Sequence, residues 1–150
     1  MSIAVAIGAL LASWPAAQQN SDGRLNKIIE QFESGEAALA NDHWRITSLE
    51  HNPFLVDDLE AFLNELEEED AARPRLTPIV RIPHEADQDF HHVVKQILDA
   101  GAMGIVLPQV RTADEVTKLV RAMRYPPQRG AQFPEPRGRR GWGPTAATRV

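Results

Sequence analysis

The chain has 150 residues, 43% of them hydrophobic and 25% charged, an ordinary globular composition with enough apolar material for one core. Its net charge of -5 argues against a general nucleic-acid binder, because binding to a phosphate backbone needs a positive surface. The sequence contains no cysteine, which excludes disulfides, thiolate nucleophiles and cysteine-based zinc sites.

The N-terminal segment, residues 1–17, carries no charged side chain and ends in Trp-Pro-Ala-Ala. An apolar run followed by small residues is typical of a secretory signal peptide, which would give an exported, periplasmic location. No Lys or Arg precedes the run, so the alternative is a first strand or helix of a cytoplasmic protein. The run is too short to span a bilayer as a helix, so no stable membrane span is expected.

The first elements of the fold follow in residues 24–66. Apolar side chains at helical spacing predict a helix over 24–35, where a glycine ends it. Residues 44–49 predict a short strand. An acidic amphipathic helix comes next, because apolar side chains recur there every three or four residues. Its apolar positions are Val56, Leu59, Phe62, Leu63 and Leu66.

Two further strand–helix pairs occupy the middle of the chain. A β-branched run bracketed by prolines predicts a buried strand over 78–83. An amphipathic helix is predicted over 90–98, with Gly101 just past its end. Residues 104–108 predict another buried strand, and apolar spacing over 116–123 predicts the last helix.

Alternating strands and helices predict an α/β fold with parallel strands joined by right-handed crossovers, either as an open sheet or as a barrel. Three such units do not close a barrel. No strand is predicted after Met123. The C-terminal end of the chain, from Arg121 on, concentrates arginines, and it is either a solvated basic tail or a loop that faces an anionic substrate or a neighbouring subunit. The arginines are Arg121, Arg124, Arg129, Arg137, Arg139, Arg140 and Arg149.

Candidate site residues lie at the C-terminal ends of the predicted strands, where active sites of parallel α/β folds gather. Glu50 and His51 follow the first strand, Arg81 interrupts the second, and Gln109 follows the third. A histidine there is a candidate general base, because its pKa is ordinarily near neutrality; an ordinary loop histidine is the alternative. Arg81 within an apolar run needs a carboxylate or an anionic ligand, so an ion pair and a substrate clamp both stay open.

Five ordered segments resemble the HpcH/HpaI aldolase/citrate lyase family, over about residues 44–149. The first three are Leu-Glu-His-Asn-Pro-Phe, Pro-Ile-Val-Arg-Ile-Pro and Ile-Leu-Asp-Ala-Gly-Ala-Met-Gly-Ile-Val-Leu-Pro. The last two are Arg-Tyr-Pro-Pro and Arg-Gly-Trp-Gly-Pro. In order, they occupy residues 49–54, 78–83, 97–108, 124–127 and 140–144.

The resemblance implies roughly the first half of a (β/α)8 TIM barrel over residues 24–150. It implies a lyase that cleaves 4-hydroxy-2-oxo acids by a retro-aldol reaction into a pyruvate-type product and an aldehyde. A divalent metal, Mg²⁺ or Mn²⁺, would polarise the keto group and stabilise the enolate. The family's metal-binding glutamate and aspartate belong to later strands, so their positions are expected beyond Val150.

The resemblance also implies roles for individual residues. His51 takes the position of the family's acid/base histidine, and Asp99 that of the aspartate that orients it. Arg81 matches the arginine that holds the substrate beside the developing negative charge, and Gln109, after the third strand, is expected to bind substrate as well. The acidic residue often found three positions before the family's histidine is Ser48 here.

Two alternatives to a catalytic lyase remain. A non-catalytic half-barrel would serve as a binding or assembly module, and its uncovered edge strands invite pairing with another chain. A homo-oligomer is therefore expected in either case. An open-sheet nucleotide-binding protein has less support, because no glycine-rich loop joins a predicted strand to a helix.

Overall fold

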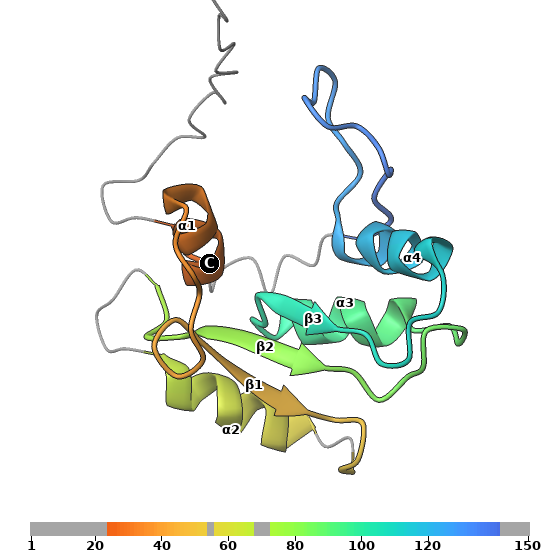
Figure 1. The fold of residues 1–150 in the computed structure, drawn as a ribbon. Helices are drawn as coiled ribbons and strands as arrows, with labels where there is room; N and C mark the ends of the chain where they lie inside the picture. Colours follow the sequence, from red (N-terminus) through yellow and green to blue (C-terminus); the bar gives the residue numbers. More distant parts are fainter. Residues whose placement is uncertain (1–23, 54–55, 68–72, 142–150) are drawn as a thin grey trace, which may run out of the picture.

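Three parallel strands form the centre of the fold, which the computed structural model describes for residues 24–53, 56–67 and 73–141 (Figure 1). The predicted signal segment, residues 1–17, lies outside the described residues. Strands and helices alternate along the chain. They are α1 (Lys27–Ser34), β1 (Trp44–Ser48), α2 (Val56–Leu66), β2 (Thr77–Arg81), α3 (His91–Asp99), β3 (Gly104–Val106) and α4 (Ala113–Met123).

The strands lie in the order β1-β2-β3, and each pair is parallel. The register pairs Ser48 with Arg81 and Arg81 with Val106. Register partners share a face of a sheet, so these three side chains form one row at the C-terminal ends of the strands. The predicted α/β class with parallel strands is confirmed, and the arrangement is consistent with part of a TIM-barrel-like fold.

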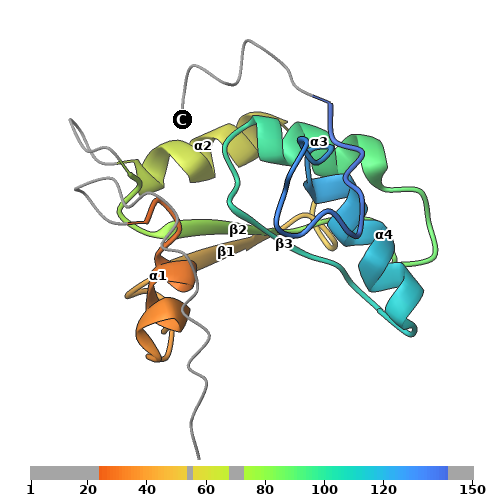
Figure 2. The same ribbon diagram turned by 90° about the horizontal axis from the view of Figure 1, so that it is seen from above.

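Helices α2 and α3 pack on one face of the sheet, whereas α1 lies away from them near the N-terminal ends of the strands (Figure 2). The backbone N–H of Lys27 donates to Thr77 Oγ1 at 2.8 Å, and Asn26 Nδ2 donates to the Met103 carbonyl at 3.1 Å. Both acceptors lie where β2 and β3 begin, so α1 is held at that end of the sheet.

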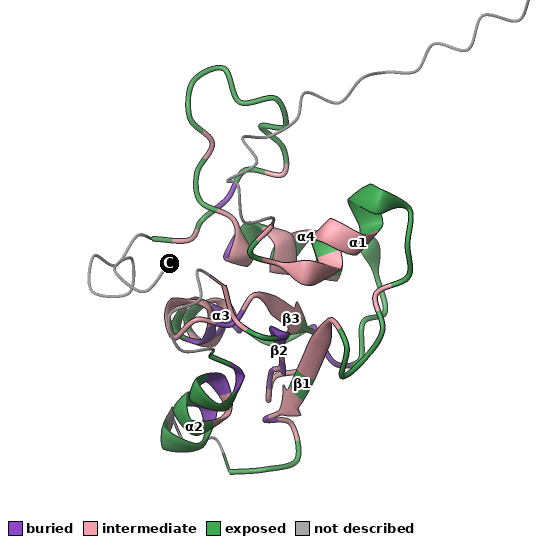
Figure 3. Ribbon diagram, turned by 90° about the vertical axis from the view of Figure 1, so that its left-hand side faces the viewer, coloured by how far each residue is buried: buried purple, intermediate pink, exposed green. Residues whose placement is uncertain are grey.

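The core lies between the sheet and helices α2 and α3, and the predicted apolar helix positions account for much of it (Figure 3). On the opposite face, Ile46 and Val106 keep 42% and 37% of their surface exposed. One sheet face is therefore covered and the other is open. The buried cluster consists of Leu49, Leu59, Leu63, Val80, Ile82, Phe90, Val94, Ile97, Ala102 and Ala122.

Helix ends are set by local chemistry. Asn26 caps α1 by accepting the backbone N–H groups of Ile28 and Ile29, and Gly35, with φ of 75°, ends the helix as predicted. Helix α4 begins at Ala113, three residues before the predicted start, because Thr112 and Glu115 form a capping box.

The strands are shorter than predicted at their C-terminal ends, where Leu49, Pro83 and Pro108 lie outside them. A proline has no N–H to donate to the ladder, which limits how far β2 and β3 continue. Within residues 124–141 the chain forms no strand, in line with the prediction. Among the described residues, no helix combines the length and apolar character needed to cross a membrane.

Candidate active site

An arginine and a glutamate meet at the C-terminal ends of β1 and β2. The Nη1 atom of Arg81 lies 2.8 Å from Glu50 Oε2, and Arg81 Nε donates to Ser48 Oγ at 2.9 Å. The parallel register brings Ser48 beside Arg81, and Glu50 follows two residues later. The guanidinium is therefore held in place by the last residue of the adjacent strand and by a glutamate that follows it.

His51 joins the same carboxylate. Its Nε2 atom lies 3.3 Å from Glu50 Oε2, so one glutamate oxygen faces both the imidazole and the Arg81 guanidinium. The Glu50 side chain is only 16% exposed, whereas that of His51 is 73% exposed. A histidine oriented by a half-buried carboxylate and open to solvent is placed to exchange a proton with a bound molecule.

Arg81 itself keeps 34% of its side chain exposed. The sequence allowed two roles for Arg81, a structural ion pair or a contact that holds the substrate. The geometry is compatible with both roles. Glu50 and Ser48 engage Nη1 and Nε, while Nη2 has no hydrogen-bond or ion-pair partner within the described residues. A guanidinium offers several N–H donors in a fixed plane, so this free nitrogen can bind a carboxylate or keto oxygen.

Gln109 follows β3 at the same end of the sheet, the C-terminal end of the strands, and has a left-handed conformation with φ of 53°. Its Nε2 atom donates to Glu85 Oε1 at 3.3 Å. Arg111 pairs with Glu85 at 3.2 Å and with Asp87 at 3.3 Å. The hydrogen bond to Asp87, followed by attraction to that carboxylate, raises the pKa of Arg111 above its ordinary value. Gln109 thus belongs to a polar cluster beside the Arg81 row.

Asp99 lies elsewhere. It is the last residue of α3, which returns the chain to the N-terminal end of β3, opposite to the strand end that His51 follows. Its carboxylate accepts a hydrogen bond from Arg140 Nη2 at 2.8 Å, and the Arg140 guanidinium lies 4.7 Å from the centre of the Tyr125 ring. Within the described residues, the carboxylate beside His51 is Glu50. The predicted orienting role of Asp99 has no contact here that supports it, and it stays a prediction.

The described carboxylates at the strand ends do not by themselves fit a divalent metal. Glu50 pairs with Arg81, and Glu85 and Asp87 pair with Arg111. Across residues 24–53, 56–67 and 73–141, no group of three or more Asp, Glu, His or Cys side chains is arranged to hold an ion. A metal site would need ligands other than these.

Sequence reasoning singled out His51, Arg81 and Gln109 but not the part played by Ser48. The hydroxyl of Ser48 accepts from Arg81 only because β1 and β2 pair in this register. Because the register of a strand pair decides which side chains lie side by side, the partner strand had to be known before this contact could be found.

The model of the family described as HpcH/HpaI aldolase/citrate lyase matches residues 47–136. That segment contains His51, Arg81, Asp99 and Gln109, so it includes each residue predicted for the site. The match covers more than half of the chain, and it confirms the resemblance found in the sequence.

Several curated proteins are similar to this chain. The "Hydroxypyruvate/pyruvate aldolase" of Roseobacter denitrificans is 33% identical over 116 residues, which are 77% of this chain and 38% of that protein. The enzyme of the same name from Delftia acidovorans is 40% identical over 85 residues, 56% of this chain and 28% of that protein.

The "4-hydroxy-2-oxovalerate aldolase" of Novosphingobium aromaticivorans is 34% identical over 107 residues, 71% of this chain and 34% of that protein. The chain thus spans about a third of the length of the curated relatives that it matches. On the match of the family model, which covers the strand ends described above, this chain belongs to the HpcH/HpaI aldolase/citrate lyase family.

Proposed function

We propose that this chain contributes the acid/base and anion-binding part of the active site of an aldolase, with 4-hydroxy-2-oxo acids as its substrates. Relatives are named as aldolases of hydroxypyruvate/pyruvate and of 4-hydroxy-2-oxovalerate. The observation that carries the proposal is the shared pairing of His51 and Arg81 with Glu50 at one end of the sheet.

In the proposed retro-aldol reaction, His51 removes the proton of the substrate's 4-hydroxyl group. The bond between C3 and C4 then breaks, the aldehyde leaves, and the bonding electrons form the enolate of the pyruvate-type product. Arg81 supplies a fixed positive charge for the substrate oxygens on which negative charge develops. His51 finally returns its proton to C3, which gives the 2-oxo acid and regenerates the base.

Two further residues take supporting parts in this proposal, and Asp99 is a third candidate. Glu50 positions both His51 and Arg81, since its Oε2 atom lies within 3.3 Å of the one and 2.8 Å of the other. Gln109 binds substrate from the neighbouring strand end, as the sequence predicted. Asp99 would act on His51 only through an arrangement other than the contact with Arg140.

The family resemblance implies a divalent metal such as Mg²⁺ or Mn²⁺, whose chemistry would be Lewis-acid activation of the keto group. We propose that its ligands lie outside the described residues, because the strand-end carboxylates already pair with arginines. Addition of a chelator should then abolish activity without unfolding the described domain.

The test is a coupled assay of pyruvate release from a 4-hydroxy-2-oxo acid, with and without Mn²⁺. His51→Ala should lower the rate by about 10²-fold or more, the usual contribution of a positioned acid/base group. His92→Ala is the matched control, because His92 is an exposed histidine on α3, away from the Glu50 cluster. Release that His51→Ala leaves unchanged would contradict the assignment.

One feature favours the alternative function, a non-catalytic assembly module. Besides the open sheet face, α1 and the residues before it leave Leu25, Ile29 and Phe32 exposed, at 40%, 45% and 70%. Exposed apolar surface of this kind marks sites of association, so we propose a homo-oligomer in either case. A folded chain that assembles but releases no pyruvate under any metal condition would favour the module, and a monomer by light scattering would contradict the oligomer.

A further inference from the structure

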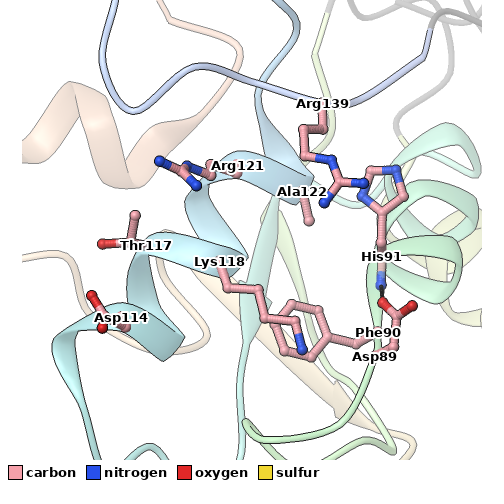
Figure 4. Close-up of a pocket in the computed structure, with 9 residues that line it drawn as sticks. All are labelled: Asp89, Phe90, His91, Asp114, Thr117, Lys118, Arg121, Ala122 and Arg139. Atoms are coloured by element: carbon pink, nitrogen blue, oxygen red, sulfur yellow. Dashed lines mark hydrogen bonds between the residues drawn. The ribbon is translucent and has the colours of Figure 1, made fainter.

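A pocket of about 230 Å³ opens between α3, α4 and the segment that carries Arg139 (Figure 4). Its lining includes no residue of the Ser48, Glu50, His51 and Arg81 cluster. We call it the α3–α4 pocket. It is smaller than the roughly 300–1,000 Å³ typical of sites for drug-sized ligands, so it suits a small molecule rather than a chain segment.

The pocket has an apolar floor. The Phe90 ring and the Ala122 methyl group line it, and both residues belong to the buried core, at 0% and 2% exposure. The α4 residues on the pocket recur at helical spacing, so one face of that helix forms a wall. The floor is thus part of the packed core.

Basic side chains form the rim. Lys118 Nζ lies 4.8 Å from the centre of the Phe90 ring, and Arg121 stands one helical turn further along α4. In Figure 4 the Arg139 side chain extends toward the His91 ring from across the pocket. The backbone N–H of Arg139 donates to the Arg121 carbonyl at 2.7 Å, which holds this residue beside α4.

Within residues 24–53, 56–67 and 73–141, the guanidinium groups of Arg121 and Arg139 form no hydrogen bond or ion pair. Arg81 and Arg140, by contrast, each pair with a carboxylate at 2.8 Å. An arginine fork is shaped to bind carboxylate or phosphate oxygens, so these unpaired groups present binding capacity at the rim.

The pocket also contains two carboxylates, and each has a local role. Asp89 accepts the backbone N–H of His91 at 3.3 Å, at the start of α3. Asp114 lies in the first turn of α4, where the helix dipole favours a negative charge. Neither carboxylate lies within ion-pair distance of Arg121 or Arg139, so neither neutralises these two guanidinium groups.

We propose that the α3–α4 pocket binds a small organic oxyanion, whose charged group contacts Arg139 and Arg121. Phosphate and carboxylate groups share the chemistry that this rim recognises. The inference does not rest on the proposed aldolase reaction, because it uses none of the residues at the strand ends.

The experiment is a ¹H–¹⁵N NMR titration of the full 150-residue chain at constant ionic strength, with phenyl phosphate and benzoate as separate probes. Saturable shifts at the amides of His91 and Ala122 are expected, and the tighter probe identifies the oxyanion class. Benzyl alcohol, which keeps the ring but has no charge, should cause no saturable shift. Arg139→Gln should weaken binding by about tenfold, the loss expected for one charge-assisted hydrogen bond.

Arg129→Gln is the matched control, since it removes the same charge from an arginine that does not line the pocket. It should leave the dissociation constant unchanged, as should Arg81→Gln at the strand ends. Equal binding by Arg139→Gln and the unaltered chain would overturn the proposal. Shifts that center on His51 and vanish in Arg81→Gln would overturn it too, because the probe would then occupy the strand-end site.

Discussion

The two ends of the sheet carry the same kind of ion pair in different settings. At the C-terminal ends of the strands, Arg81 and Glu50 lie 2.8 Å apart, and the glutamate also faces an exposed histidine. At the other end, Arg140 and Asp99 are also 2.8 Å apart, but the arginine stacks on Tyr125 and the pair is mostly covered. The surroundings of the two ion pairs, and not their geometry, therefore distinguish a candidate reaction site from a structural contact.

The largest expected effect is on the reaction, from a change at the C-terminal pair. Glu50→Gln removes the charge that orients His51 and Arg81, and we expect pyruvate release to fall by about 10²-fold, the lower end of acid/base contributions. The free energy of unfolding should change by less than about 1 kcal/mol, because partly exposed pairs contribute little. Enzyme assay and urea denaturation of the same sample would separate the two. A large loss of stability would make this pair structural as well.

The opposite pattern is expected at the covered pair. Asp99→Ala leaves Arg140, 16% exposed, without its carboxylate and should lower the free energy of unfolding by about 2–3 kcal/mol. Adding Arg140→Met should recover part of that loss, since the unpaired charge is then gone. Activity per folded molecule should stay within about twofold, because among the described residues the carboxylate that contacts His51 is Glu50, whereas Asp99 pairs with Arg140. A folded Asp99→Ala chain with much lower activity would support the predicted orienting role.

A smaller effect is expected where residues 138–140 pack against the C-terminal end of α4. A methyl group at Gly138 would lie 2.1 Å from the Arg124 carbonyl oxygen and 2.3 Å from that of Tyr125. Gly138→Ala should therefore displace the segment and cost about 1–3 kcal/mol, as overpacking usually does. Gly141→Ala is the control, since its nearest neighbour, Lys95 Cε, would be at 3.9 Å. Equal thermal stability of the two variants would contradict this account.

The smallest effect concerns Glu115, a carboxylate that accepts backbone N–H groups at the start of α4. Hydrogen bonds from the backbone N–H groups of Arg111 and Thr112, the former contributing more, lower the pKa of Glu115 below its ordinary value. The folded state thus favours the ionised form. The stabilisation is present above the unfolded pKa and is lost as the pH falls through the folded value. Glu115→Gln should slightly reduce the loss of unfolding free energy at acid pH. An unchanged dependence on pH would show that the ionised Glu115 cap does not contribute to stability.

Much of the fold followed from periodicity. The helices α2 and α3 and the strand β2 lie where apolar spacing and proline brackets placed them, because local patterns specify which face of an element is buried. The ends of elements were less predictable, since the capping box at Thr112 and the loss of ladder bonds at Pro108 depend on a few backbone contacts.

The residues of the candidate site likewise differ in how far the sequence could identify them. His51 and Arg81 were identified because they follow or interrupt a strand, and a strand end is visible in the sequence. The position of Asp99 illustrates the converse. A helix between parallel strands returns to the far end of the sheet, so its last residue lies opposite the strand-end loops.

The sequence by itself determined the α/β class, the order of the elements, the family and the identity of the acid/base and arginine candidates. Only the tertiary structure decided which carboxylate lies beside His51, that Ser48 holds Arg81, and that Arg121 and Arg139 line one pocket. The physical reason is that side-chain types and periodicities are local properties. Pairing across strands and between helices brings together residues far apart in the chain, and no single segment encodes it.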